Sequence, residues 1–186
     1  MNTALGLIEF KTVPIGIYAT DVMIKAADIQ LLFTAPSCPG KYITIISGKV
    51  ADVEISIKQG EEAGDTFFID SCVIPNIDES VIPALTGTVD VPDIKAIGII
   101  ETIAAVSAIL VGDMIAKAAS VKLLEIRLAR GLGGKGEVFY TGELSDVESA
   151  NKAVMEAAEE ESGASYGIVS AVVIARPSPA LIEAIA

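Results

Sequence analysis

Apolar runs of strand length alternate with longer amphipathic stretches, and the same order occurs in each half of the chain. Apolar residues such as Ile17, Val22 and Ile24 recur within one stretch at a spacing that predicts a helix. In the second half, Ser145 followed three residues later by Glu148 predicts the capped start of an acidic helix. The apolar runs predict strands at residues 5–10, 29–34, 42–47 and 67–74, and again at 97–102, 121–128, 137–141 and 167–175. Each half is therefore predicted to have the α+β class, with about four strands in an antiparallel sheet and about three helices packed on it.

The two halves are related by a direct repeat. The segment ALGLIEF at residues 4–10 recurs 92 residues later as AIGIIET, and DVMIKAADIQLL recurs at the same spacing as DMIAKAASVKLL. Beyond the second strand the spacing grows to 94, so the loop that contains SCPG is about two residues shorter than its counterpart. We therefore predict one domain at 1–88, a linker at 89–95 and a second domain at 96–186.

Composition narrows the possible functions. Hydrophobic residues make up 52% of the chain but aromatic residues only 5%, which predicts a closely packed core of Ala, Ile, Val and Leu. The net charge of −12 argues against nucleic acid and anionic membranes as partners, because both require a basic surface. The chain has no histidine, which removes Ser-His and Cys-His pairs and disfavours a hydrolytic enzyme. No signal peptide is visible and no apolar run is long enough to cross a bilayer, so we expect a soluble, cytosolic protein.

The repeated segments resemble the bacterial microcompartment (BMC) shell-domain family in both halves. ALGLIEF and AIGIIET match its first strand, DVMIKAAD and DMIAKAAS its first helix, and VVIARPSPAL its last strand and the stretch that follows. The resemblance is to the tandem, non-permuted type. It implies a structural protein that is not an enzyme. Three chains would form a flat pseudo-hexameric tile that joins other shell proteins in a microcompartment shell.

The same resemblance assigns positions to the tile edge and to a central pore. Lys25 and Lys117 match the lysine through which neighbouring tiles pack, and Arg176 matches an arginine near the edge. Asn76 stands at the place of Arg176 in the first half, which puts that contact in doubt there. The pore would be lined by the loops between the second and third strands, which contain Ser37, Cys38, Pro39, Gly40 and Lys41 in one half and Gly131, Leu132, Gly133 and Gly134 in the other.

The cysteine in the first of these loops is the candidate metal ligand. Within the family, the loop most resembles that of the tandem shell proteins of propanediol-utilisation microcompartments, in which three cysteines hold a [4Fe-4S] cluster. Iron–sulfur clusters require several thiolates, and one chain offers only Cys38 and Cys72 without close spacing. A three-fold axis would bring three copies of Cys38 together, held by stiff flanking prolines. Cys72 is expected to be a buried core thiol, and Lys41 either offsets the charge of the cluster or is solvated.

These residues predict a shell tile with one [4Fe-4S] cluster per trimer, which moves electrons across the shell or supplies enclosed redox enzymes. The alternative is a tile without a cluster, whose pore passes small polar metabolites. An oxidoreductase and a ligand-sensing module are further alternatives. The segment GLGGKG formally fits the dinucleotide fingerprint, but a strand is expected after it where that fingerprint needs a helix.

Overall fold

The structure is a computed structural model that describes residues 3–90, 94–128, 133–160 and 166–185. The chain divides into two compact units, Met1–Ile77 and Asp78–Ala186, and each is described by itself. The sequence repeat suggested a first domain that ends at residue 88. Residues 78–88 instead belong to the second compact unit, so the boundary of the repeat and the boundary of the packed units differ.

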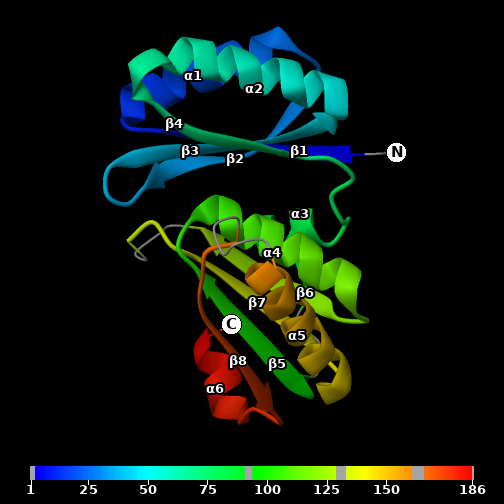
Figure 1. The fold of residues 1–186 in the computed structure, drawn as a ribbon. Coiled ribbons are helices and arrows are strands. Elements are labelled where there is room, and N and C mark those ends of the chain that lie inside the picture. Colours follow the sequence, from blue (N-terminus) through cyan, green and yellow to red (C-terminus); the bar gives the residue numbers. More distant parts are fainter. Residues whose placement is uncertain (1–2, 91–93, 129–132, 161–165, 186) are drawn as a thin grey trace. The chain divides into compact units, whose positions relative to one another are not determined.

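The first unit is a four-stranded antiparallel sheet with two helices over one face (Figure 1). Its central strands are β1 and β3, and its edge strands are β2 and β4. The elements are β1 (Thr3–Phe10), α1 (Val13–Ala26), β2 (Ile29–Ser37), β3 (Lys41–Lys49), α2 (Val50–Gly64), a 3-10 turn η1 (Asp65–Phe67) and β4 (Phe68–Ile74).

The second unit repeats this arrangement. Its sheet has the order β6-β7-β5-β8, with α4 packed on β6 and β7 and α5 packed on β5 and β8. The elements are α3 (Val81–Thr86), β5 (Ala96–Thr102), α4 (Ala105–Ala118), β6 (Lys122–Leu128), β7 (Gly136–Gly142), α5 (Leu144–Glu160), β8 (Ile168–Ala175) and α6 (Pro179–Ile185). The predicted α+β class and the repeat of four antiparallel strands with helices are thus confirmed. Among the described residues, each helix is too short or too polar to span a bilayer.

Helix α1 is confirmed, but some of its large apolar residues do not face the core. Its buried residues are Gly16, Ala19, Thr20 and Met23, whereas the side chain of Ile17 is 53% exposed. A Cβ on Gly16 would lie 2.4 Å from the ring of Tyr42, so only glycine allows the helix to approach the sheet this closely. The core face of α1 therefore consists of small residues and Met23, and Ile17 points outward.

The predicted cap of α5 is wrong. The helix begins at Leu144, and the carbonyl of Glu143 accepts hydrogen bonds from the backbone N–H groups of Asp146 and Val147. Glu143 therefore occupies the cap position, and Ser145 lies inside the first turn.

Candidate metal centre

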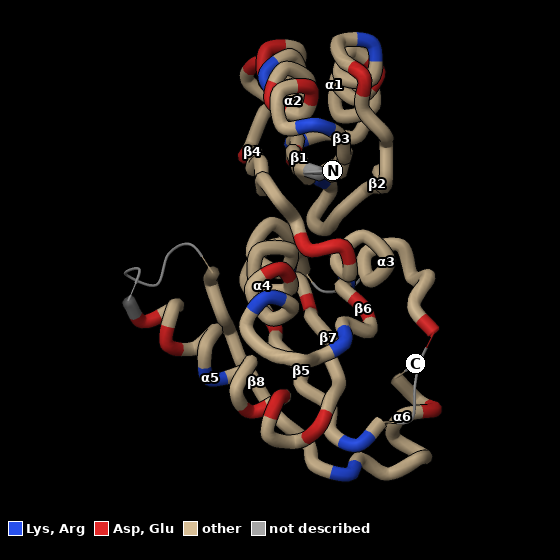
Figure 2. Tube along the Cα trace, turned by 90° about the vertical axis from the view of Figure 1, so that its right-hand side faces the viewer, with Lys and Arg blue, Asp and Glu red and all other residues tan. Residues whose placement is uncertain are grey.

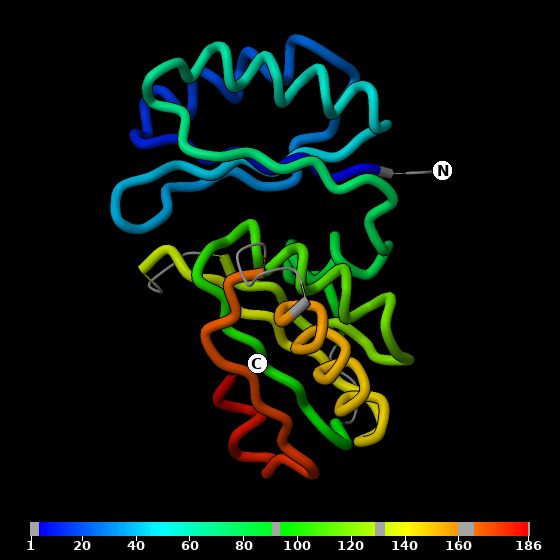
Figure 3. Tube along the Cα trace, in the orientation of Figure 1, coloured from blue at the N-terminus to red at the C-terminus, as the bar shows by residue number. Residues whose placement is uncertain are grey.

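Cys38 lies at the tip of a tight hairpin between β2 and β3, which the chain trace follows as a closed loop (Figure 3). Strand β2 continues three residues beyond its predicted end at residue 34, because Pro36 and Ser37 pair with Tyr42 and Lys41. Proline fits here because β2 is an edge strand, where a missing N–H need not break a ladder hydrogen bond. The hairpin thus fixes the distance of the thiol from the sheet.

The turn itself has three residues between the paired strands. The N–H of Gly40 donates a 2.9 Å hydrogen bond to the carbonyl of Ser37, and the Cys38–Pro39 peptide bond is cis. Gly40 has a φ of 90°, which L-residues with side chains rarely adopt. The thiol of Cys38 is free and half-buried, whereas Pro39 and Gly40 are exposed. The turn therefore places the one thiol of Cys38 at the tip of the hairpin, on a backbone that a hydrogen bond holds in one conformation.

An ion pair joins the base of this hairpin to the centre of the sheet. The Nζ atom of Lys41 lies 3.2 Å from Oε2 of Glu9, whose side chain is only 7% exposed. The second unit repeats the pair with Lys135 and Glu101 at 2.6 Å, although both of its side chains are more exposed. Lys41 is therefore neither simply solvated nor an unopposed positive charge. Sequence reasoning missed the glutamates, although each lysine and each glutamate recurs at the spacing of the repeat.

The counterpart loop between β6 and β7 is described only in part. Gly131 and Leu132 lie outside the described residues, whereas Gly133 and Gly134 form a turn with φ angles of 66° and 93°. Strand β7 follows from Gly136, as expected. A dinucleotide site would need a helix at this point.

The second cysteine does not lie near the first. Cys72 is on β4, at the opposite edge of the sheet from β2, and three strand spacings correspond to about 14 Å. It is half-buried and not fully buried as predicted, because an edge strand is covered by neighbours on fewer sides. Burial raises the pKa of this thiol, and the nearby Asp70 carboxylate raises it further.

The metal-ligating side chains in the described part of one chain are too few to hold an iron–sulfur cluster. They fit a cluster only if several chains contribute ligands to it. Across residues 3–90, 94–128, 133–160 and 166–185, no three His, Cys, Asp or Glu side chains are grouped so that they could hold a metal ion. Cys38 is a soft sulfur donor of the type that iron–sulfur clusters use. The described part of one chain therefore groups a single thiol at this hairpin, and a cluster held there would need further ligands from outside it.

The predicted edge residues lie at corresponding places in the two units. Lys25 pairs with Asp21 at 2.5 Å, and Lys117 pairs with Asp113 at 2.6 Å, each one turn along the helix. Figure 2 shows that α1 and α4 both carry acidic and basic positions. Asn76 and Arg176 also correspond. Asn76 lies two residues after the end of β4 and Arg176 one residue after the end of β8, and each has a left-handed backbone, with φ angles of 53° and 48°. Arg176 is exposed, and its N–H donates to the carbonyl of Lys95.

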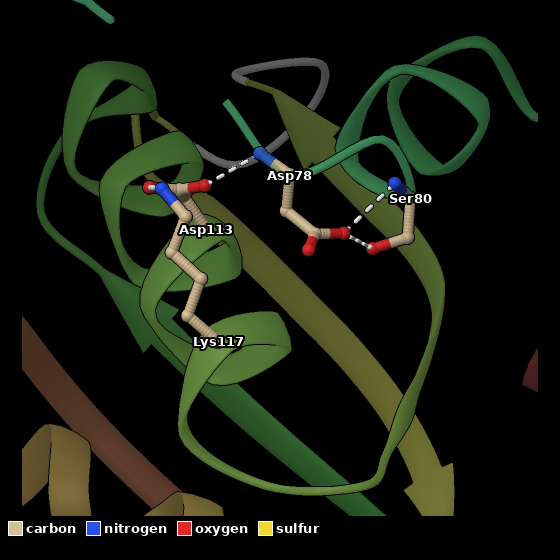
Figure 4. A network of polar contacts seen from close by, with 4 residues as sticks. All are labelled: Asp78, Ser80, Asp113 and Lys117. Carbon is tan, nitrogen blue, oxygen red and sulfur yellow. Dashed lines mark hydrogen bonds and ion pairs between the residues drawn. The ribbon is translucent and has the colours of Figure 1, made fainter. Parts of the chain in front are cut away.

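Asp113 makes a further contact that sequence reasoning missed. Its Oδ1 atom accepts a 2.8 Å hydrogen bond from the backbone N–H of Asp78, as Figure 4 shows. The carboxylate of Asp78 in turn accepts hydrogen bonds from the N–H and hydroxyl of Ser80. This network fixes the segment that leads into α3 against α4.

Comparisons with known proteins agree on one family. A family model described as the BMC domain matches residues 4–77 and 96–177. The chain is 35% identical to "Bacterial microcompartment shell protein PduT" of Citrobacter freundii, over 87% of this chain and 88% of that protein. It is 28% identical to "Carboxysome assembly protein CcmO" of Synechococcus elongatus, over 98% of this chain and 68% of that protein.

Solved structures extend this agreement to the fold. The crystal structure of a microcompartment protein from Desulfitobacterium hafniense has a TM-score of 0.92 at 38% identity, over 98% of this chain and 99% of that one. A fused permuted hexameric shell protein from the RMM microcompartment has a TM-score of 0.60 at 22% identity, over 87% and 86% of the two chains, and shows likeness of fold alone.

Proposed function

The chain belongs to the BMC-domain family and is a shell protein of bacterial microcompartments, and we propose that its homotrimer holds one [4Fe-4S] cluster at a central pore. Cys38 of each chain would supply one thiolate. The three thiolates would hold three irons of the cluster and leave the fourth to a small external ligand. The trimer would join other shell proteins, and its relatives are structural shell proteins and not enzymes.

The observation that carries this proposal is the position of Cys38. A free sulfur at the tip of a hairpin, with no second soft ligand grouped beside it in the described part of its own chain, fits a site completed by symmetry. The hydrogen bond from Gly40 to Ser37 holds the turn, and the Glu9–Lys41 pair holds its base. Three such hairpins could present their sulfurs at one axis without rearrangement of the sheet.

A bound cluster would supply one-electron redox chemistry, and its place in a pore suits electron transfer across the shell. The residues of the chain would bind the cluster and limit solvent access. Pro39 and Gly40, exposed at the tip, would lie against the neighbouring hairpins. Enclosed redox enzymes are the expected electron partners, and a plugged pore would not pass metabolites.

The test is the iron and sulfide content of protein that is prepared and reconstituted without oxygen. We expect about four irons and four sulfides per three chains in the wild-type protein, and none above background in Cys38→Ser. Cys72→Ser is the matched control, because that thiol lies on the opposite edge strand, and it should retain both. Retention of the iron by Cys38→Ser would refute the assignment.

A shell tile without a cluster is the second candidate. In this tile the single thiol at each hairpin would line the pore without binding a metal. Colourless wild-type protein without iron after anaerobic reconstitution would support this tile, whose pore would then pass small polar metabolites.

A further inference from the structure

An apolar cavity of about 230 Å³ lies within the second unit, beneath the C-terminal helix α6. Ile182 and Ile185 of α6 form one wall, and Ile97 of β5 and Phe139 of β7 form the opposite wall. The connection that follows α3 adds Val89 to the lining. Helix α6 has no buried residue, as expected for a helix that a cavity separates from its sheet.

The cavity is on the face of the sheet away from α4 and α5. Neighbouring residues of a strand point to opposite faces. The hydroxyl of Tyr140 donates a 3.3 Å hydrogen bond to Oδ1 of Asn151 on α5, so the preceding residue, Phe139, points the other way. Figures 1 and 2 both place β5 between α5 and α6. Phe139 is nevertheless only 7% exposed and Ile97 only 1%, because α6 and the connection after α3 cover this face.

The cavity is large enough for a small organic molecule. A dry apolar cavity of about 150 Å³ holds benzene, and the same ratio gives room for about nine non-hydrogen atoms here. Water is a poor occupant of such a space, because each molecule needs about two to four polar partners. Glu125 is the one charged residue among the described residues that line the cavity.

The carboxylate of Glu125 has one oxygen engaged and one available. Nε of Arg127 donates a 2.8 Å hydrogen bond to Oε2, and Nη2 lies 2.8 Å from the same atom. The guanidinium also lies 4.5 Å from the centre of the Phe139 ring and donates to the carbonyl of Ile185. Within the described part of the chain, Oε1 of Glu125 accepts no hydrogen bond. An acceptor is therefore left over beside an apolar space.

The first repeat lacks these polar groups. At a spacing of 92 residues Glu125 corresponds to Phe33, and Arg127 corresponds to Ala35. The strand register is equivalent, because Phe33 faces Ile45 as Glu125 faces Phe139. Both repeats form the same sheet, so the fold of this strand does not require the carboxylate.

We propose that the cavity binds a neutral, largely apolar molecule of about nine non-hydrogen atoms that donates one hydrogen bond to Oε1 of Glu125. Arg127 already balances the charge of Glu125, so a charged molecule would lose its hydration without gaining a counter-ion. The bound molecule would contact both α6 and the sheet and so hold the helix in place. The inference goes beyond the proposed cluster, because Cys38 belongs to the first unit.

Indole and indene are suitable probes, because they share one size and shape and differ in a single group. Indole has an N–H donor where indene has a CH₂ group. Equilibrium dialysis of the full-length protein against each probe measures binding from the absorbance of the protein-free chamber. We expect saturable binding of indole, and binding of indene that is weaker by about fivefold or more, because the hydrogen bond to the carboxylate is lost.

Filling the cavity tests where the probe binds. Val89→Phe should weaken indole binding by about tenfold or more, because the larger side chain occupies the space. Ile182→Phe does the same from the opposite wall, and gives a second variant if the first does not fold. Val169→Phe is the matched control, because Val169 is 49% exposed and does not line the cavity. Indole should also raise the Tm of the wild-type protein but not that of Val89→Phe.

Replacing the carboxylate tests the hydrogen bond. Glu125→Met removes the acceptor and should lower the affinity for indole to that for indene, while the affinity for indene stays unchanged. Glu183→Met is the control, because Glu183 is exposed on α6 and does not line the cavity. This control should keep the preference for indole.

The outcomes decide the site independently of the cluster. A wild-type protein that shows no saturable binding up to the solubility limit of indole would overturn the proposal. Binding that survives both Val89→Phe and Ile182→Phe would put indole elsewhere and overturn it as well. A preference for indole that persists in Glu125→Met would overturn the role of Glu125. Cys38→Ser should bind indole like the wild-type protein, so loss of the cluster would leave this site intact.

Discussion

Replacing Lys41 with methionine should destabilise the first unit, because the Glu9 carboxylate would remain buried without its cation. The side chain of Glu9 is 7% exposed and that of Lys41 is 34% exposed, with 3.2 Å between the charged atoms. Removal of one partner from a fully buried pair costs about 3–5 kcal/mol. The partial exposure of Lys41 lowers this, and we expect a loss of about 2–3 kcal/mol in the free energy of unfolding.

The second repeat contains the matched control. Lys135 and Glu101 form the equivalent pair, but their side chains are 43% and 27% exposed. Water can solvate the glutamate that remains after Lys135→Met, so we expect a loss of about 1 kcal/mol or less. The difference between Lys41→Met and Lys135→Met therefore measures how much the burial of the glutamate adds to the cost of losing its ion pair.

Urea unfolding followed by circular dichroism measures both variants at one protein concentration. With an m value of about 1.5 kcal/mol/M, Lys41→Met should lower the midpoint of the first unit by about 1.3–2 M, and Lys135→Met should lower that of the second unit by less than about 0.7 M. Glu9→Gln combined with Lys41→Met should recover part of the loss, because no buried charge remains. Equal shifts for the two single variants, or no shift for Lys41→Met, would refute the reasoning.

Two further changes probe the core of the second unit. Gly98→Ala should cost about 1–3 kcal/mol in urea unfolding, because its Cβ would lie 2.1 Å from the Tyr140 ring. Gly142→Ala meets its nearest atom at 3.3 Å and should cost less, so an equal cost would contradict the steric argument. Burial strongly raises the pKa of Tyr140, so its contribution to stability is complete below pH 10 and is lost as the pH rises further. Tyr140→Phe should therefore lose less Tm between pH 9 and pH 11 than the wild-type protein, and equal losses would refute this.

Sequence patterns predicted the positions of the helices and strands well. They predicted less well which face of a helix is buried and which side chains are in contact. Strands such as β1 are short apolar runs between turn residues, so their positions follow from local sequence. The outward face of α1 could not be read in this way, because Gly16 forms the core face by allowing contact with Tyr42, which is distant in sequence. The partner of Lys41 depends on strand register, since Glu9 lies on another strand. The cluster and the pore residues stay predictions.

The boundary after Ile77 means that the unit of duplication is not the unit of packing. A fragment cut at the end of the sequence repeat would carry α3 away from β6 and α4, and would leave Val81 and Ala84 exposed to water. An unfused ancestor with one repeat would have had to find this surface on another molecule. Fusion places the helix and its docking surface on one chain, where the effective concentration of one for the other is set by a short connection and no longer by the amount of protein in the cell.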